Sequence, residues 1–215
     1  MPVRAFVIEH LEPVVSKWVW IEYKHASEIV GRSRLIITNV KDPREREVLS
    51  RIAGEVLEES IADLPLPRSS IVVLDPQGTK ELVPEDFESE TYVVVGGIMG
   101  DYPPRGRTKE LLTSRLPGAR IRTLGDRQFS VDGAVYVAKR ISEGARLEEI
   151  EVADELEIVV TESFSIILPF AYPLVEGRPL VSEELVDYLV YEIEEEEAYA
   201  IRRGRPRSVA ELSDL

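Results

Sequence analysis

Cysteine is absent from this 215-residue chain, and histidine is rare, with His10 and His25 the two present. The absence of cysteine excludes disulfides, thiolate nucleophiles and thiolate metal sites, and two histidines cannot build a histidine metal cluster. No apolar run approaches the roughly 20 residues of a membrane-spanning helix, and the N-terminus lacks the pattern of a signal peptide. We therefore expect a cytoplasmic protein without a membrane segment or a metal site.

Basic residues are scarce relative to acidic ones, 26 against 40, which gives a net charge of −14. A nucleic-acid-binding protein usually carries a basic surface that displaces counterions from phosphate. The glutamate-rich run at 192–197 is typical of a solvated helix face. A local basic patch remains at Arg105, Arg107, Lys109 and Arg115. The charge favours a basic protein as partner, and RNA stays the alternative.

The length of 215 residues suits one compact domain with a full core and a small appendage. Arginine outnumbers lysine 20 to 6, and glutamate reaches 30 residues. Together with the lack of cysteine, this usage is typical of a heat-adapted, archaeal source.

Strands and helices alternate through the first 145 residues. Apolar runs predict strands at 4–9, 34–38, 71–74, 91–95 and 119–124. Helices are expected at 17–30 with Ser16 as N-cap, from Asp42-Pro43 through Leu57, at 107–115, and through Val135 to Ile141. This alternation predicts an α/β fold with a parallel sheet covered by helices on both faces.

The alternation of strands and helices ends at about residue 145. Segments 155–160 and 163–168 are expected to form an antiparallel strand pair, and Ser182 to begin a helix that faces Leu185, Leu189 and Ile193 inward. We divide the chain into a core at 1–145, an appended unit of strands and helix at 146–200, and a mobile tail at 201–215.

The most informative stretch is the run GGIMGDYPPR at residues 96–105, which follows the predicted buried strand at 91–95. Glycine lets backbone groups approach a ligand without a Cβ in the way, and proline fixes the loop at low entropic cost. In open α/β sheets, ligands bind at the carboxyl ends of strands. The alternative is a tight turn without a ligand.

Two further loops have the same design, at residues 74–79 (LDPQGT) and 124–134 (LGDRQFSVDGA). Three such strand ends can converge on one pocket. None has the spacing of the dinucleotide fingerprint or of the phosphate-binding P-loop. The pocket is therefore expected to hold its ligand through backbone contacts.

These loops carry a family resemblance, together with the segments FVIEHLE at 6–12, SKWVWIEY at 16–23 and RTKEL at 107–111. From about residue 5 to residue 190 the chain resembles the fungal SPOUT-type methyltransferases that modify an arginine of a small-subunit ribosomal protein, and their archaeal relatives described as RNA methyltransferases. The LDPQG loop is also similar to the first cofactor loop of bacterial tRNA guanine methyltransferases of the same superfamily. The resemblance implies a SPOUT-like parallel sheet with a C-terminal trefoil knot, and S-adenosylmethionine bent in the knotted loops.

One position departs from the family pattern. Near residues 168–172 (LPFAY) the fungal proteins carry an arginine where this chain has Ala171. The substrate geometry of the fungal proteins therefore cannot be assumed here. The three loops that carry the cofactor assignment are intact.

The resemblance and the loop design together give the expected cofactor-binding residues. Backbone groups are the first choice for adenine and ribose, Asp75 is a candidate for the ribose hydroxyls, and Arg107 is expected to pin the loop or the cofactor carboxylate. The full set is Leu74, Asp75, Pro76, Gly96, Gly97, Ile98, Gly100, Arg107, Leu124 and Gly125.

The catalytic candidates are carboxylates at strand ends, because a guanidinium nucleophile is protonated up to a pKa above ~12 and needs carboxylates to hold it and accept a proton. They are Asp101, Asp126, Asp132 and Glu9. Asp101 follows the glycine of the most specific loop, and either a cofactor or a substrate role is open to it. Asp126 and Asp132 have helix capping as their alternative, and we interpret His10 as structural.

We predict an S-adenosylmethionine-dependent protein arginine methyltransferase that acts on a basic, ribosomal protein. The alternative is an RNA methyltransferase of the same fold. A third hypothesis is a cofactor-binding module without turnover, for which Ala171 is the one hint. The appended segment is expected to cover the face through which other family members dimerise, so a monomer is favoured over a homodimer.

Overall fold

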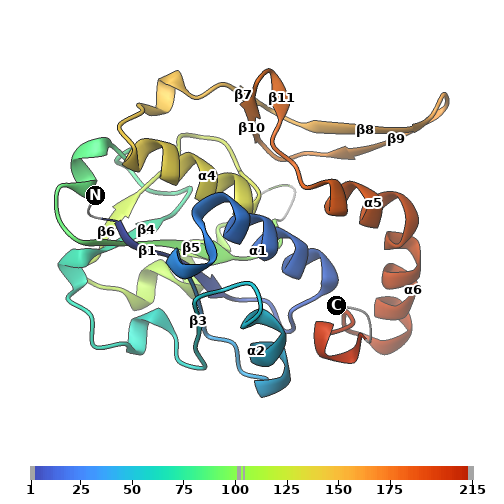
Figure 1. The fold of residues 1–215 in the computed structure, drawn as a ribbon, viewed down its shortest axis with the longest axis horizontal. Helices are drawn as coiled ribbons and strands as arrows, with labels where there is room; N and C mark the ends of the chain where they lie inside the picture. The colour runs from blue at the N-terminus through green and yellow to red at the C-terminus, as the bar shows by residue number, and fades with distance from the viewer. Residues whose placement is uncertain (1–2, 101–102, 104, 213–215) are drawn as a thin grey trace.

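A six-stranded, entirely parallel sheet forms the centre of the protein (Figure 1). The computed structural model describes residues 3–100, 103 and 105–212. The strand order is β3-β2-β1-β5-β4-β6, so β2 and β3 are added outward from β1 on one side, while on the other side β5 is inserted between β1 and the earlier strand β4. The strands are β1 (Val3–His10), β2 (Leu35–Thr38), β3 (Glu55–Val56), β4 (Ile71–Leu74), β5 (Thr91–Gly97) and β6 (Arg120–Arg122). The predicted parallel sheet is confirmed.

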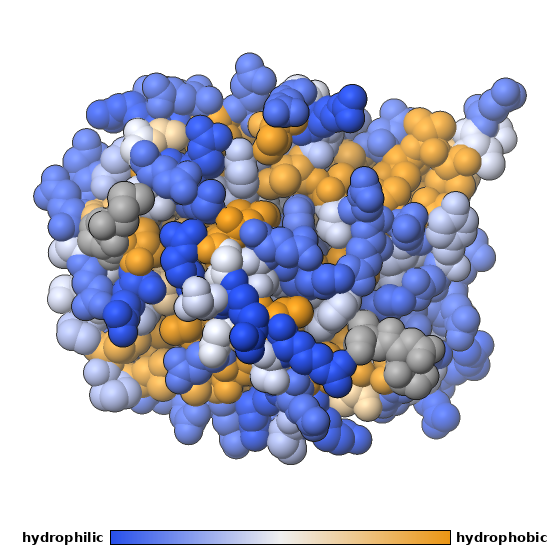
Figure 2. Space-filling model, in the orientation of Figure 1, coloured by the Kyte–Doolittle hydropathy of each residue, from blue (hydrophilic) through white to orange (hydrophobic). Residues whose placement is uncertain are grey.

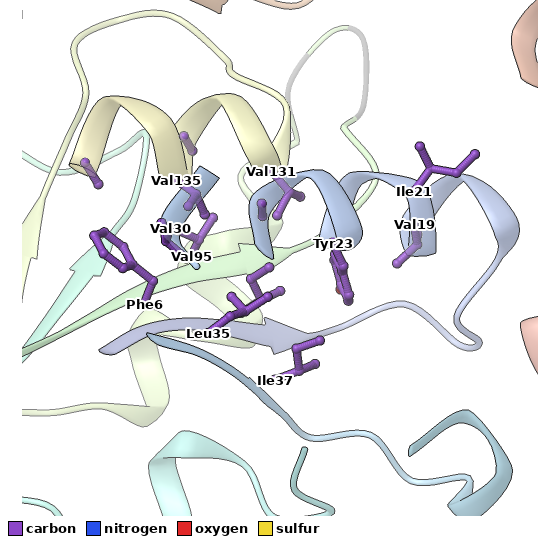
Figure 3. Packing of buried hydrophobic residues seen from close by; sticks show 14 of the residues in the cluster. Phe6, Val19, Ile21, Tyr23, Val30, Leu35, Ile37, Val95, Val131 and Val135 are labelled. Carbon is purple, nitrogen blue, oxygen red and sulfur yellow. The ribbon is translucent and has the colours of Figure 1, made fainter. Parts of the chain in front are cut away.

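Both faces of the sheet are buried, as expected for parallel strands. Helices α1 (Lys17–Val30) and α4 (Val131–Ser142) cover one face, and Phe6 of β1 lies beneath them (Figure 3). Ile8, two positions further along β1, belongs to the same buried cluster. Val7, which points the other way, packs in a second cluster that includes Ile61 and Leu112. These residues belong to or adjoin short helices on the second face, among them α3 (Arg107–Leu111) and the 3-10 helices η2 (Ile61–Asp63) and η5 (Thr113–Arg115).

Helix α1 begins and ends where its sequence predicts. The Ser16 hydroxyl accepts a hydrogen bond from the Val19 amide at 3.3 Å, which satisfies one of the free amides of the first turn. The helix ends at Gly31, whose φ of 87° lies in a region that glycine adopts without strain. No helix among the described residues is long and apolar enough to cross a bilayer.

The helix expected from Asp42 through Leu57 is shorter than predicted. Helix α2 (Pro43–Leu49) keeps the expected N-cap, since Asp42 accepts from the Arg44 amide at 2.8 Å, but the chain then turns and forms β3. A Cβ at Gly54 would lie 3.0 Å from the Arg32 carbonyl oxygen, so this residue allows the chain to pass close to the neighbouring turn. Val56 pairs with Ile37 and extends the sheet. Sheet pairing therefore overrides the helical periodicity.

The appended unit contains the predicted antiparallel pair and additional short strands. Strands β8 (Leu156–Thr161) and β9 (Phe164–Leu168) form a hairpin that projects past the rest of the fold in Figure 1. A second small sheet has the order β11-β10-β7. Its strands and the following helices are β7 (Val152–Ala153), β10 (Tyr172–Val175), β11 (Arg178–Pro179), α5 (Glu183–Tyr191) and α6 (Ile193–Arg203). Leu185 and Leu189 face inward as predicted.

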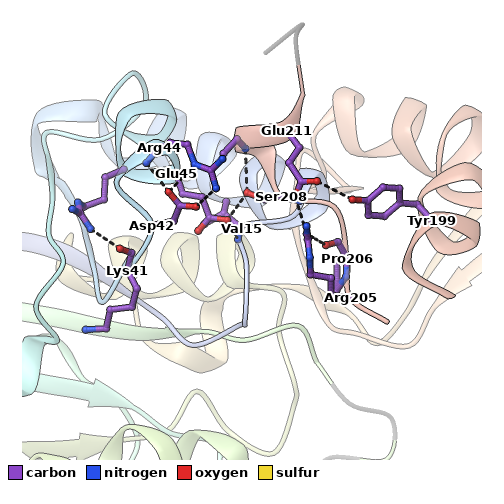
Figure 4. A network of polar contacts seen from close by, with 12 residues as sticks. Val15, Lys41, Asp42, Arg44, Glu45, Tyr199, Arg205, Pro206, Ser208 and Glu211 are labelled. Carbon is purple, nitrogen blue, oxygen red and sulfur yellow. Dashed lines mark hydrogen bonds and ion pairs between the residues drawn. The ribbon is translucent and has the colours of Figure 1, made fainter. Parts of the chain in front are cut away.

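The prediction of a mobile tail at 201–215 is wrong for its described part, which ends at Leu212. This part packs on the core (Figure 4). Helix α6 continues to Arg203, and a 3-10 helix η7 (Val209–Glu211) follows. Ser208 donates to the Glu45 carboxylate at 2.5 Å, and the Val209 amide donates to the Val15 carbonyl at 2.8 Å. Because the side chain of Val209 is fully buried, apolar burial adds to these hydrogen bonds and holds the segment in place.

Candidate functional site

A cavity of about 170 Å³ lies where the predicted loops meet at the carboxyl ends of β4 and β5 and after β6. Parallel strands place all three ends at the same edge of the sheet, so loops distant in sequence converge there. The N-terminus of α4 and the start of α3 close the remaining sides. The cavity is lined by Leu74, Asp75, Pro76, Gln77, Val95, Gly96, Ile98, Gly100, Arg105, Gly106, Arg107, Thr108, Leu124, Arg127, Gln128, Phe129, Ser130, Val131 and Ala134.

Eight of the ten predicted cofactor-binding residues line this cavity. They are Leu74, Asp75, Pro76, Gly96, Ile98, Gly100, Arg107 and Leu124. Their roles toward a cofactor stay predictions, but the structure brings them together from all three loops.

Gly97 and Gly125 do not line the cavity. A Cβ on Gly97 would lie 2.0 Å from the Tyr23 hydroxyl oxygen, so this glycine is required for the packing of α1 on the sheet. Gly125 has a φ of 86°, and its carbonyl accepts a hydrogen bond from Thr123 Oγ1 at 2.7 Å. It shapes the third loop from outside the cavity.

Asp75 supports the first loop with both carboxylate oxygens. Oδ1 accepts from the Gln77 amide at 2.8 Å, and Oδ2 accepts from the Thr113 hydroxyl at 2.6 Å. The Asp75 amide in turn donates to the Arg122 carbonyl at 2.8 Å. This buried side chain thus ties the first loop to η5 as well as lining the cavity.

Arg107 holds the second loop in position. Its guanidinium donates to Glu12 Oε1 at 3.2 Å and to the Met99 carbonyl oxygen. Glu12 Oε1 also accepts from the Met99 amide at 2.8 Å. The loop after β5 is therefore attached both to the start of α3 and to the connection between β1 and α1. Glu12 was not predicted as a site residue, although it belongs to the segment at 6–12 that carries the family resemblance.

Glu9, one of the predicted catalytic carboxylates, is placed away from the cavity. It is fully buried on the second face and accepts from Thr38 Oγ1 at 2.5 Å, Ser60 Oγ at 2.5 Å and the Ile61 amide at 2.9 Å. These three donors satisfy the carboxylate and tie β1 to β2 and η2. The geometry assigns Glu9 to structure, which corrects the catalytic prediction.

Asp126 and Asp101 have no described place in the cavity. Asp126 is exposed on the third loop and is not among the lining residues. The pKa of the neighbouring Arg127 is raised mainly by its hydrogen bond to Asp154, and the charge of Asp126 adds to this. Asp101 lies outside the described residues, so its predicted role stays a prediction.

Asp132 belongs to a buried polar cluster between α1 and α4. Its Oδ2 lies 2.6 Å from His25 Nδ1, and its Oδ1 accepts from the Gly133 amide at 2.9 Å. Burial alone would lower the pKa of His25, but the hydrogen bond and the charge of Asp132 outweigh it and leave this pKa raised. The helix N-cap is Ser130, so neither predicted role of Asp132, catalysis at the cavity or capping, matches its placement.

Glu22 completes this cluster and touches the wall of the cavity. Its carboxylate accepts from the Trp18 indole at 2.7 Å and from the amide of Val131, a lining residue, at 3.2 Å. Burial, with a further contribution from the Asp132 charge, raises the pKa of Glu22 to about 8. The first turn of α4 is thus attached to a carboxyl group whose pKa is raised by burial. The sequence offered no signal for Glu22 beyond its place in the SKWVWIEY segment.

His10 stands at the end of β1 and packs edge-on against Tyr23, with its Nδ1 3.0 Å from the tyrosine hydroxyl. Burial lowers the pKa of His10 to about 4, so its imidazole is neutral at physiological pH. This arrangement agrees with the structural interpretation of this residue.

The appended unit also reaches the cavity. Ala171 donates its amide to the Gln128 carbonyl at 2.8 Å and bridges to Phe129, and both of these residues line the cavity. A Cβ on Gly100 would lie 2.3 Å from both the Phe170 ring and the Gln128 side chain. Ala171 itself is buried, so the position at which the sequence departs from the fungal pattern packs directly behind the third loop.

Comparison with known proteins identifies the family. Residues 5–196 match the family model described as protein arginine N-methyltransferase SFM1-like. The chain is 33% identical over 199 residues to protein arginine N-methyltransferase SFM1 of Saccharomyces cerevisiae, covering 86% of this chain and 93% of that protein. The chain belongs to the SFM1-like family.

Solved structures agree with this membership. The yeast arginine methyltransferase SFM1 complexed with SAM matches with a TM-score of 0.79 and 31% identity, over 90% of this SFM1-like chain and 93% of that one. The complex with SAH has a TM-score of 0.78, covering 86% and 94%. The dual-specific Trm10 from Thermococcus kodakaraensis matches at 0.52 and 18% identity, over 67% and 95%, which is a likeness of fold. The expected SPOUT-like α/β fold is confirmed.

Proposed function

We propose that this protein is an S-adenosylmethionine-dependent methyltransferase that modifies arginine in a basic protein. The observation that carries the proposal is the cavity at the carboxyl edge of the sheet, built from all three predicted cofactor loops in a chain of the SFM1-like family. Yeast SFM1, which shares this fold, has been solved with SAM and with SAH.

The residues of the cavity suit an adenosyl ligand. Leu74, Val95, Leu124 and Ala134 supply an apolar wall for a planar ring. A Cβ on Gly96 would meet the Ile98 side chain at 3.4 Å, so the absence of a side chain there keeps space at the strand end. When bound, S-adenosylmethionine supplies a methyl group on a positively charged sulfur. The chain must exclude water from this group and align the nucleophile, about 3 Å from the methyl carbon.

A guanidinium nucleophile also needs a carboxylate to orient it and receive its proton. Among the described lining residues the carboxylate is Asp75, whose two oxygens are already used within the protein. Asp101, in the loop that follows Gly100, remains our candidate for this role.

A ribosomal protein is the substrate that we propose, because a net charge of −14 attracts basic polypeptide and repels nucleic acid. We accordingly propose a cytoplasmic location, which this substrate requires. RNA is the second candidate, and the observation in its favour is that Arg105, Arg107 and Arg127 line the cavity.

The proposal includes a trefoil knot around the cofactor loops. In its support, the chain that follows β6 runs against the loop that follows β4. The Thr123 amide donates to the Lys80 carbonyl at 2.8 Å, and the Leu82 amide donates to the Thr123 carbonyl at 3.0 Å. From this position the chain continues to α4, on the sheet face that α1 also covers.

Transfer of a labelled methyl group tests the activity. The protein is incubated with methyl-labelled S-adenosylmethionine and salt-washed ribosomes, and ribosomal protein is then separated from RNA. We expect label in protein, released as methylarginine on acid hydrolysis. Label in RNA alone would establish the second candidate, and absence of label from both fractions would contradict methyl transfer to ribosomes.

Cofactor binding is tested separately by calorimetry. We expect S-adenosylmethionine and its demethylated product to bind with a micromolar Kd, about 8 kcal/mol. Gly96→Val should weaken binding at least tenfold, because the added side chain occupies the cavity. Tyr92→Val, near the other end of the same strand, is the matched control. Unchanged affinity in a folded Gly96→Val variant would show that the cofactor binds elsewhere.

A further inference from the structure

The acidic charge of the protein is concentrated in the appended unit. Residues 146–200 contain 16 acidic and 2 basic side chains, so this quarter of the chain carries the entire net charge of −14. The core at 1–145 and the C-terminal residues 201–215 together are neutral. A basic partner is therefore attracted to one side of the molecule and not to the whole of it.

The β8–β9 hairpin of this unit exposes large apolar side chains. Leu156 and Ile158 of β8 are buried against the body, whereas Val159, one position further, is 69% exposed. On β9, Ile167 lies opposite Glu157 and is 56% exposed, as is Phe164 near the tip. The space-filling view shows an apolar surface along this projecting hairpin (Figure 2). Exposed apolar side chains gathered on one element mark an interaction site more often than scattered ones do.

The same hairpin is acidic and lacks compensating charges. Residues 151–168 contain five acidic side chains and no lysine or arginine. Among the described residues, Arg127 pairs with Asp154 at the base of the hairpin, while Glu155, Glu157 and Glu162 have no ion-pair partner. Of these carboxylates, Glu157 is the cross-strand neighbour of Ile167, and Glu155 and Glu162 flank strand β8. Apolar contact rimmed by polar groups is the usual composition of a protein-binding surface.

The base of the hairpin is connected to the cofactor cavity. Strand β9 ends at Leu168, Phe170 then lies against Gly100, and the Ala171 amide donates to the Gln128 carbonyl at 2.8 Å. Gly100 and Gln128 both line the cavity. At about 3.3 Å per residue, a partner that grips the hairpin between its tip and Phe170 lies within about 20 Å of the cavity. The distance is comparable to the width of a small protein surface, so one partner can contact both places.

We propose that the exposed face of the β8–β9 hairpin, through Val159, Ile167 and their acidic neighbours, is the docking surface for the basic protein substrate. The inference rests on the proposed function, since it names where the substrate of that reaction is held. Charge selects this occupant: the carboxylates attract a surface rich in lysine and arginine, repel the phosphates of RNA, and repel the equally acidic hairpin of a second copy.

Steady-state methylation of salt-washed small ribosomal subunits tests the apolar part of the surface. The double variant Val159→Ser with Ile167→Ser is compared with Tyr191→Ser with Ile201→Ser, which removes side chains that are 80% and 83% exposed on α5 and α6. We expect KM for the subunits to rise about tenfold in the hairpin variant, as for central apolar contacts in interfaces. The turnover at saturation, the control variant and the affinity for S-adenosylhomocysteine should stay unchanged. An unchanged KM in the hairpin variant overturns the proposal.

Charge reversal tests the acidic part. Glu157→Lys with Glu162→Lys should raise KM for the subunits and weaken its dependence on salt, whereas the control pair Glu47→Lys with Glu55→Lys on the core should leave KM unchanged. Equal effects of the two pairs would mean that net charge alone matters and that the hairpin is not the docking surface.

A photoreactive benzoylphenylalanine at position 159 identifies the occupant. A cross-link to the same ribosomal protein that receives the methyl label supports the proposal. A cross-link to RNA or to a second copy of the chain, or none, overturns it. The two proposals fail differently: if the unmodified protein labels no protein at all, the proposed function is wrong, whereas labelling that is insensitive to the hairpin variants removes the docking surface and leaves the function intact.

Discussion

The neighbouring glycines Gly96 and Gly97 face opposite sides of β5. A Cβ on Gly97 would be 2.0 Å from the Tyr23 hydroxyl oxygen and 2.9 Å from Ile8, whereas a Cβ on Gly96 has its nearest contact, 3.4 Å, with Ile98. We therefore expect Gly97→Ala to lower the free energy of unfolding by about 1–3 kcal/mol through overpacking. Gly96→Ala should change it by less than about 1 kcal/mol, because relief of glycine entropy offsets the small contact.

Urea denaturation of the two variants measures this difference. A Gly97→Ala variant as stable as the parent protein would show that α1 moves aside without penalty. Retained stability with lost cofactor binding would restore the cofactor role that the sequence suggested.

At the level of single residues, the loops at the strand ends were placed correctly from the sequence, whereas several buried side chains were not. The three glycine- and proline-containing loops do meet at one cavity. They could be predicted because strand ends and turn residues are signals that lie within a short stretch of sequence. Gly97 was misplaced because alternation puts it on the face of Val93 and Val95, and only the packing of α1 shows that Tyr23 fills that face. Glu9 was misplaced for the same reason, since its three donors come from β2 and η2.

At the level of elements, the contact between α1 and α4 should make stability depend on pH. Glu22 keeps its proton up to about pH 8 in the folded protein but releases it near its ordinary value when unfolded. The folded state then binds more protons between these values, so the free energy of unfolding falls as pH rises through this window. His25 acts in the same direction, because the stability from its raised pKa is present below its ordinary value and is lost as pH rises through the folded value.

His10 acts in the opposite direction, because burial lowers its pKa to about 4 and the unfolded state then binds more protons up to its ordinary value. Since the Glu22 and His25 contributions outweigh it, we expect the protein to be less stable at pH 8.5 than at pH 5.5 by on the order of 2 kcal/mol. Glu22→Gln cannot ionise and should flatten this dependence, while Glu47→Gln on the exposed face of α2 should leave it intact. Denaturant titrations at both pH values provide the measurement. A pH dependence that survives Glu22→Gln unchanged would assign it to other groups.

The contact of the C-terminal segment with the core should contribute to the stability of the fold. Val209 is fully buried in η7, so Val209→Ala should lower the free energy of unfolding by about 2 kcal/mol. Val159→Ala makes the same chemical change on the exposed hairpin and should alter stability by less than about 0.5 kcal/mol. Thermal or urea unfolding compares the pair, and equal effects would mean that the segment contributes nothing to the fold.

The errors among elements share one physical cause. The helix expected through Leu57 and the mobile tail were both read from local pattern, yet Val56 pairs with Ile37 and Val209 packs beside Val15. Each partner lies far away in sequence, so propensity and composition cannot reveal it. Elements with strong local signals, such as α1 with Ser16 as its cap and the β8–β9 hairpin, were predicted correctly.

For the whole molecule, alternation of strands and helices was enough to predict a parallel sheet covered on both faces. The strand order β3-β2-β1-β5-β4-β6 was not predictable in the same way, because apolar runs of similar composition carry no information on which neighbours pair. The placement of charge, by contrast, is visible in the sequence once the boundary near residue 145 is drawn.

We expect the protein to be a monomer, since the appended unit carries a net charge of −14 and two such surfaces repel each other when they approach. Sedimentation equilibrium at micromolar concentration and about 0.1 M salt, where charges act over a Debye length of about 10 Å, should give a mass near 24.3 kDa. At about 1 M salt the repulsion is screened to about 3 Å, so a monomer there as well would show that the exposed apolar side chains of the hairpin are too few to hold a dimer. A mass near twice 24.3 kDa at low salt would mean that an apolar interface outweighs the repulsion, and the hairpin would then be the first surface to examine.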